Sequence, residues 1–243
     1  MAGRTMLYRP GGYKEILMQR LIQGLRKFQE EVFPAKQELF ERLAKGQQPS
    51  TLFITCADSR VMPDMFTQSE PGELFVIRNA GNIVPPFARQ SGGVTATIEF
   101  AVVALGVRHI IVCGHTDCGA MKGLLHLESL TEMPTVASWL MQADATRRIV
   151  KDNYETEDEA QLVDAMIREN VLMQLKNLET HPSVASRLAR GDLSLYGWIY
   201  NIGTGQVDSF DARKQRYVRL DGTSLPHATP VARLQKTPPL LNW

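Results

Sequence analysis

The sequence predicts an α/β fold with a mostly parallel central sheet of about four strands, an antiparallel edge strand, flanking helices and an N-terminal helical arm. Two observations lead to this class. Several short runs of β-branched and aromatic residues are almost continuously apolar, which is typical of strands buried on both faces of a parallel sheet. Segments with helical periodicity separate these runs, and that alternation indicates strand-helix-strand crossovers.

Four apolar runs are predicted to be the parallel strands, and each is bounded by Gly, Pro or polar residues. They are TLFITC (51–56), ELFVIR (73–78), RHIIVCG (108–114) and LSLYGWIYN (193–201). A fifth run, QVDSFD (206–211), follows the turn sequence IGTG. Because a short turn joins antiparallel neighbours, this run is predicted to pair antiparallel at an edge of the sheet.

Helical patterns fill the intervals between these strands. Residues 93–106 end in a glycine suited to a C-terminal cap. HPSVASRLARG (181–191) is a further predicted helix, with a proline early and a glycine at its end. Residues 158–178 place apolar side chains on or near one helix face, at Leu162, Met166, Val171, Leu175 and Leu178.

Both ends of the chain lie outside this alternating pattern. We predict a helical arm over residues 1–35, an α/β domain over 36–215 and a proline-rich tail over 216–243. The tail is either a loose terminus or an arm docked on a partner. The N-terminal stripe packs either on the chain's own sheet or on a neighbouring subunit, since its helix connects no two strands; it consists of Ile16, Leu17, Leu21, Leu25 and Phe28.

Composition argues against several classes of protein. The 27 Lys and Arg residues balance 26 Asp and Glu, so no overall field favours nucleic acid or an anionic membrane. No window approaches the roughly 18 apolar residues of a membrane span, and the N-terminus lacks a secretory apolar run. Three cysteines are too few for a disulfide framework. We expect a cytoplasmic protein without nucleic-acid or membrane partners; enclosure in a carboxysome stays open.

Reactive side chains follow the first predicted strand, in FITCADSR (53–60). Cys56, Asp58 and Arg60 stand there at alternating positions. An isolated buried cysteine is more often a core thiol, and an Asp–Arg pair is more often a surface ion pair. A partner set changes this interpretation: His115 follows the third predicted strand, and Cys118 is predicted in the first turn of the next helix.

Cys56, His115 and Cys118 have the side-chain chemistry of zinc ligands, and they are predicted at the carboxyl ends of parallel strands. Three ligands leave one position for water, which is the catalytic pattern. Asp58 either ligates the metal or accepts a hydrogen bond from its water. We favour the second interpretation, in which Arg60 orients Asp58. A helix beginning near residue 116 should stabilise the Cys118 thiolate.

Cys113 lies within the apolar run of the third strand. We interpret it as a small buried apolar residue rather than a ligand.

Three motifs resemble the signatures of the β-class carbonic anhydrases, and most closely those of the plant and cyanobacterial branch. They are C-A-D-S-R (56–60), R-N-A-G-N (78–82) and G-H-T-D-C-G-A (114–120). The similarity extends through G-G-V-T-A-T-I-E-F and the late pattern E-N-V, Q, N-L, H-P and L-Y-G-W-I-Y. It covers residues 15 to 210 approximately, and it leaves out the extreme N-terminus and the tail.

The resemblance implies one Zn²⁺ per chain held by Cys56, His115 and Cys118, with Asp58 and Arg60 as a catalytic dyad. It also implies a homodimer, or a higher even oligomer, with sites at the subunit interface. The implied substrate contacts are a hydrogen bond from Gln47, an apolar carbon dioxide pocket and a backbone amide; the pocket residues are Phe75, Ala80 and Phe100, and the amide belongs to Gly119.

The implied reaction is the reversible hydration of carbon dioxide to bicarbonate and a proton, by attack of zinc-bound hydroxide. A hydrolase for carbonyl sulfide or carbon disulfide on the same zinc site is one alternative, and a structural zinc or binding module is a non-enzymatic one. A branch of the family closes its site by moving the aspartate onto zinc, and it has a tryptophan where this chain has Phe53. We therefore expect Asp58 to be off the metal, ligating it only in a closed state, and paired with Arg60.

Overall fold

The computed structural model describes residues 10–88, 92–223 and 227–229, and the chain divides into two compact units, residues 1–47 and 48–243. The first unit is helical. It contains α1 (Pro10–Lys27), a π-helical turn, α2 (Phe33–Ala35) and α3 (Gln37–Leu43). The residues of the predicted apolar stripe are exposed, by between 38% at Phe28 and 68% at Leu21. Among the described residues, no helix is both long and apolar enough to cross a membrane.

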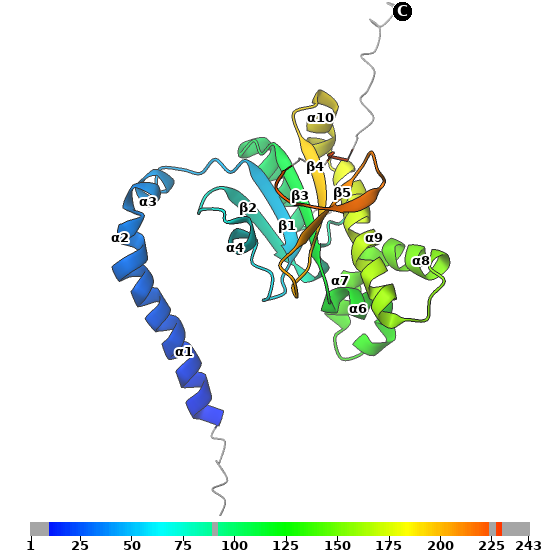
Figure 1. Ribbon diagram of the computed structural model, residues 1–243, viewed down its shortest axis with the longest axis horizontal. Helices are drawn as coiled ribbons and strands as arrows, with labels where there is room; N and C mark the ends of the chain where they lie inside the picture. The colour runs from blue at the N-terminus through cyan, green and yellow to red at the C-terminus, as the bar shows by residue number, and fades with distance from the viewer. Residues whose placement is uncertain (1–9, 89–91, 224–226, 230–243) are drawn as a thin grey trace, which may run out of the picture. The chain divides into compact units, whose positions relative to one another are not determined.

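The second unit is built on one sheet with the strand order β2-β1-β3-β4-β5-β6 (Figure 1). Four strands are mutually parallel: β1 (Thr51–Cys56), β2 (Leu74–Asn79), β3 (His109–His115) and β4 (Ser194–Tyr200). These are the four runs that the sequence predicted, shifted by about one residue at their ends. The predicted mostly parallel sheet is confirmed.

The antiparallel end of the sheet differs from the prediction. The strand predicted over residues 206–211 is β5 (Val207–Asp211), and it pairs antiparallel with β4 as expected. It is not the edge strand, because β6 (Arg216–Arg219) pairs antiparallel with its other side. β6 is four residues long with an arginine at each end, so it carries too little apolar pattern to be recognised. It lies in the segment that we assigned to the tail, whose residues 224–226 and 230–243 are outside the described part of the chain.

The helices predicted between the strands are present. Residues 93–106 form α5 (Gly93–Glu99) and a π-helical turn that ends before Gly106, whose φ of +67° suits its capping role. Residues 158–178 form α9 (Glu159–Glu179), which begins where the Asp158 side chain accepts a hydrogen bond from the Ala160 amide. α10 (Pro182–Arg190) ends at Gly191, as predicted.

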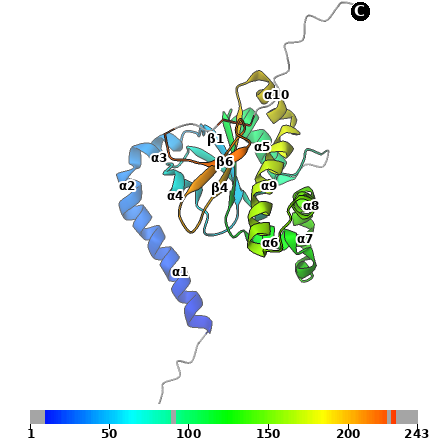
Figure 2. The ribbon, with the colours of Figure 1, turned by 45° about the vertical axis from the view of Figure 1, so that its right-hand side comes forward.

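Among the described residues, the second unit has four further α-helices, which are labelled in Figure 2. They are α4 (Pro63–Thr67), α6 (Gly119–Leu125), α7 (Pro134–Leu140) and α8 (Asp144–Asn153). The sequence made no assignment for α7 and α8. Each is short, and a turn of tighter helix interrupts the chain between them, so no long periodic pattern marks them.

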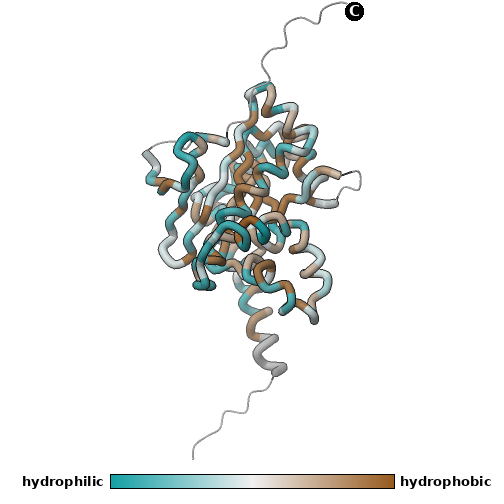
Figure 3. The backbone as a smooth tube through the Cα atoms, turned by 90° about the vertical axis from the view of Figure 1, so that its right-hand side faces the viewer, coloured by the Kyte–Doolittle hydropathy of each residue, from teal (hydrophilic) through white to brown (hydrophobic). Residues whose placement is uncertain are grey.

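The two faces of the sheet carry different amounts of core. The larger cluster contains the apolar side chains of α5, α6, α9 and α10, together with Leu52 and Ile54 of β1. The smaller cluster, on the other face, is centred on Phe53, Ile111 and Cys113. The hydropathy colouring in Figure 3 shows apolar segments in the middle of this unit and hydrophilic ones on its outer turns.

Helix α9 lies against β3 and β4 at a point where both strands have a glycine. A Cβ atom on Gly197 would stand 2.8 Å from Val171 Cγ1, and one on Gly114 would stand 3.0 Å from Val171 Cγ2. The two glycines therefore allow α9 to approach the sheet closely.

Candidate metal centre

The candidate site lies where the order in which the chain adds strands to the sheet reverses. From β1 the chain crosses to β2 on one side, and from β3 it crosses to β4 on the other. The carboxyl ends of the neighbouring strands β1 and β3 therefore lie where the strand order reverses, which is the usual position of sites in open α/β sheets. Cys56 is the last residue of β1 and His115 is the last residue of β3.

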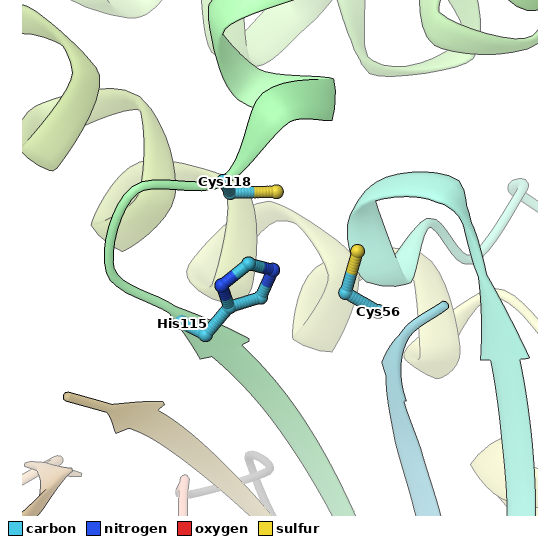
Figure 4. A group of neighbouring side chains, drawn as sticks. All are labelled: Cys56, His115 and Cys118. Carbon is cyan, nitrogen blue, oxygen red and sulfur yellow. The ribbon is translucent and has the colours of Figure 1, made fainter. Parts of the chain in front are cut away.

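Three potential ligand atoms converge at these strand ends, as Figure 4 shows. The sulfur atoms of Cys56 and Cys118 and an imidazole nitrogen of His115 all lie within 4.8 Å of one another. Their residues are nearly inaccessible, at 5%, 1% and 0% exposure. In the described part of the chain this is the one group of three such residues found. A tetrahedral ion with a preference for sulfur and nitrogen ligands fits this set.

The imidazole of His115 is oriented for ligation. Its Nδ1 lies 2.9 Å from the Thr116 carbonyl oxygen, and because a carbonyl only accepts, Nδ1 carries the proton. Nε2 then has a lone pair, and within the described residues this buried atom has no hydrogen-bond partner. A buried unpaired nitrogen is costly unless something binds it. Nε2 is therefore free to bind a cation between the two sulfur atoms.

The two cysteines of the site differ in how readily each thiol loses its proton. A hydrogen bond from Cys118 is the largest influence that lowers the pKa of Cys56, to about 4, while burial acts against it. The Gly81 amide also donates to Cys56 Sγ, at 3.5 Å. The pKa of Cys118 is raised in turn, because its proton is held in the hydrogen bond to Cys56, because the thiol is buried, and because two thiolates would repel each other. The pair therefore favours loss of the first proton from Cys56, and a divalent cation would favour loss of the second proton from Cys118.

Asp58 and Arg60 form the pair that the sequence suggested. The Arg60 guanidinium donates from Nε to Asp58 Oδ1 at 3.0 Å and from Nη2 to Oδ2 at 2.8 Å. These bonds hold the pKa of Asp58 well below its usual range. Oδ2 lies 3.8 Å from His115 Nε2, yet Asp58 is not part of the group of converging ligand atoms. The expected pairing is present, and the catalytic role of the pair stays a prediction.

The guanidinium also connects the two ligand loops. Arg60 Nη1 donates to Asp117 Oδ2 at 3.0 Å, and Lys122 is paired with the other oxygen of Asp117. Asp117 has a φ of +58°, a conformation that few non-glycine residues adopt, and it lies between His115 and Cys118. Arg60 thus ties the loop after β1 to the loop after β3.

Two expectations about the neighbouring cysteines have different outcomes. Cys113 is fully buried on the opposite face of the sheet, and burial raises the pKa of its thiol to about 12, as an inert core residue requires. The helix after β3 begins at Gly119 rather than near residue 116, so Cys118 caps it instead of lying in its first turn. The expected influence remains, because the amides of Ala120 and Met121 lower the pKa of Cys118 against the larger opposing effects.

The predicted substrate-binding residues are dispersed. Ala80 begins the turn after β2, and Gly119 directly follows Cys118, with open space where a Cβ would stand. The rings of Phe75 and Phe100 lie 6.0 Å apart, centroid to centroid. Phe75 is paired with Leu52, at the far end of β1 from Cys56. Gln47 is exposed at the end of the first unit. The roles of these five residues stay predictions.

Several residues around the site were not identified from the sequence. Arg78 donates to the Cys56 carbonyl at 3.2 Å and to the Asp58 carbonyl at 2.7 Å, which supports the loop between them. The turn that faces Cys56 contains Gly81, whose N–H donates to the Cys56 sulfur. Trp139 and Asn170 donate hydrogen bonds to carbonyls of this turn. The signal for three of them was present, in the R-N-A-G-N and E-N-V patterns, although it gave no role.

The comparisons with known proteins agree with this geometry. Residues 51–207 match the family model described as carbonic anhydrase. The structure superposes on that of the β-carbonic anhydrase CcaA with a TM-score of 0.82, at 54% identity, over 84% of this chain and 99% of that one. The chain belongs to the β-carbonic anhydrases.

Other members are similar over most of their length. The carbonic anhydrase of Synechocystis sp. is 56% identical over 195 residues, which are 80% of this β-carbonic anhydrase and 71% of that one. A tetrameric β-carbonic anhydrase of Sordaria macrospora superposes with a TM-score of 0.65 at 29% identity, over 83% of this chain and 97% of that one. The resemblance noted from the sequence is confirmed.

Proposed function

We propose that this β-carbonic anhydrase catalyses the reversible hydration of carbon dioxide to bicarbonate and a proton, at one zinc ion per chain. Cys56, His115 and Cys118 would hold the ion. The observation that carries the proposal is the convergence of these three ligand atoms within 4.8 Å, beside a carboxylate that an arginine engages. Three ligands leave a tetrahedral ion one further position, which a structural site would fill. Zinc bound there would supply a water whose pKa is lowered toward about 7.

Asp58 would orient the reacting water. Its Oδ2 lies 3.8 Å from His115 Nε2, one of the proposed ligand atoms. The Asp58 side chain is 17% exposed. Because its pKa is well below the usual range, the carboxylate is an acceptor throughout the physiological pH range. Arg60 would keep it turned toward the water and off the metal, because three donors of Arg60 engage Asp58: the amide, Nε and Nη2.

The apolar carbon dioxide pocket would need a second copy of the chain. Phe75 is in register with Leu52, four residues before Cys56, and four residues of strand span about 13 Å. Its ring is therefore too far along the sheet to line the open ligand position of its own chain. Phe100, its neighbour, is 49% exposed, as an interface residue can be. A homodimer, or a higher even oligomer, would bring both rings to the partner's ligands.

The N-terminal stripe supports the same assembly. Leu21 and Leu25 are 68% and 56% exposed, and α1 connects no strands. Within the described part of the first unit this apolar face is exposed, and exposed apolar faces of this size are typical of an association surface. The Sordaria macrospora relative is tetrameric. Light scattering should find the intact protein as a dimer or larger, and a chain without residues 1–30 should dissociate and lose activity. An active monomer would contradict this assembly.

Metal content and activity test the central proposal together. Purified protein should contain about one zinc per chain and hydrate carbon dioxide in a stopped-flow assay. Cys56→Ser, His115→Asn and Cys118→Ser should each remove most of the zinc and the activity. A Cys118→Ser protein with full zinc and normal turnover would refute the ligand assignment. Assays of the same protein with carbonyl sulfide and carbon disulfide test the alternative hydrolase function.

The location of the protein in the cell is a separate proposal. We propose a cytoplasmic location, with carboxysome enclosure as the alternative, and cell fractionation distinguishes the two.

A further inference from the structure

Helix α9 carries a row of buried amide side chains toward the turn that follows β2. Asn170, Gln174 and Asn177 are spaced so that they lie along one face of the helix, and Asn170 and Gln174 are 1% and 0% exposed. Gln174 accepts from the Val84 amide at 2.9 Å and donates to Asn170 Oδ1 at 2.8 Å. Asn177 donates to the Val84 carbonyl at 2.9 Å. Amides this deeply buried hold the segment from residue 81 to residue 84 in one position.

The first member of the row acts next to the metal centre. Asn170 Nδ2 donates to the Gly81 carbonyl at 2.9 Å. The backbone N–H of Gly81 donates to Cys56 Sγ at 3.5 Å, a normal distance for a donor to sulfur. Asn170 therefore holds the residue whose N–H faces a proposed metal ligand.

Trp139, on α7, acts on the same N–H from the other direction. Its Nε1 donates to the Ala80 carbonyl oxygen at 2.8 Å. That carbonyl and the Gly81 N–H belong to one peptide group. The indole, the peptide and the thiol thus form a continuous chain of donors and acceptors, and such chains polarise each member.

Gly81 has almost no other position available. Its φ is +81°, which favours glycine. A Cβ there would stand 2.9 Å from Met121 Cε and 3.2 Å from Ala120 Cβ, so the backbone rests directly on α6. Cys118 caps that helix. The turn that contains Gly81 therefore contacts Cys56 through a hydrogen bond and also packs on the helix that begins after Cys118.

We propose that Trp139 and Asn170 are positioning residues for the metal ligand Cys56. They hold the two peptide groups on either side of Gly81, and so keep its N–H directed at the sulfur. The inference rests on the proposed function, because it assumes that Cys56 binds the metal. A hydrogen bond to a ligating thiolate withdraws electron density from sulfur and limits its rotation, and the loss of such outer contacts typically lowers metal affinity by about 10- to 100-fold.

Trp139→Phe tests the proposal, since it removes the indole N–H and keeps an aromatic ring. The cobalt(II) form of the intact protein should show its thiolate-to-cobalt absorption band moved to longer wavelength, because the sulfur becomes a stronger donor. The zinc form should bind zinc about tenfold more weakly in an equilibrium competition with a chelator, because the sulfur is no longer held in position. Trp198→Phe is the matched control: that indole is on the opposite face of the sheet, and its Nε1 is buried without a partner among the described residues. It should leave both measurements unchanged.

A second pair of variants covers the case in which Trp139→Phe does not fold. Asn170→Ala should shift the cobalt band and weaken zinc binding, whereas Asn153→Ala, whose amide donates to the Ile149 carbonyl on α8, should not. Wild-type values in both Trp139→Phe and Asn170→Ala would overturn the positioning role while the proposed function stands. A wild-type protein that takes up neither zinc nor cobalt would overturn the proposed function, and this inference with it.

Discussion

Replacing Gly197 by alanine should destabilise the protein through α9. The added Cβ would stand 2.8 Å from Val171 Cγ1 and 3.1 Å from Leu175 Cδ1, where carbon atoms normally approach to about 3.5–4.0 Å. Val171 cannot turn away, because a β-branched residue in a helix is held in one rotamer. The helix must move instead, and overpacking of this kind typically costs about 1–3 kcal/mol. The lower chain entropy of alanine offsets this by about 0.4–1 kcal/mol, which leaves a net loss of up to about 2.6 kcal/mol.

A double-mutant cycle in urea, at one chain concentration, separates this mechanism from a general loss of strand structure. Val171→Ala alone should also destabilise, by about 1.5 kcal/mol or more, since it removes two buried carbons. The double variant should be less destabilised than the sum of the two by about 1 kcal/mol, because the new Cβ occupies the space that Val171 leaves. Two effects that add to within about 0.5 kcal/mol would refute the reasoning. Gly24→Ala, where no described atom lies within 4 Å of the new Cβ, should not destabilise.

Three further outcomes follow from the surroundings of single side chains. Cys113→Ala should retain zinc and carbon dioxide hydration, since that thiol is buried away from the site; loss of zinc would contradict this. Arg60→Lys should retain zinc but lose about 10- to 100-fold in activity, because an ammonium cannot hold Asp58 with two parallel bonds; unchanged activity would argue against the dyad. Burial lowers the pKa of His181, so the unfolded chain takes up the proton more readily. The free energy of unfolding should fall as pH drops below about 6.5, and His181→Gln should flatten that fall.

The sequence predicted the centre of the fold well because its strands are buried on both faces. TLFITC and RHIIVCG are almost wholly apolar, and such runs have few other stable arrangements. β6 and the helices α7 and α8 are short and partly exposed, so their local patterns are weak and tertiary contacts decide their structure.

The convergence of Cys56, His115 and Cys118 could be predicted because their chemistry is unusual for a strand end. Cys56 and His115 terminate neighbouring parallel strands, so their convergence follows from topology alone. The supports of the site are different. Asn170 and Gln174 are residue types that normally occupy a solvated helix face, and only the packed structure shows that they are buried. Trp139 reaches the Ala80 carbonyl from 59 positions away, which no local pattern announces.

The ligand set also spans two very different lengths of chain. His115 and Cys118 are three positions apart, whereas Cys56 precedes His115 by 59 positions, from 56 to 115. Closing the longer loop costs conformational entropy, which is recovered only when β1 pairs with β3. A chain still emerging from the ribosome can therefore offer an ion at most the local histidine–cysteine pair. The complete set exists only after β1 has paired with β3, so metal capture would follow formation of the middle of the sheet and would not nucleate it.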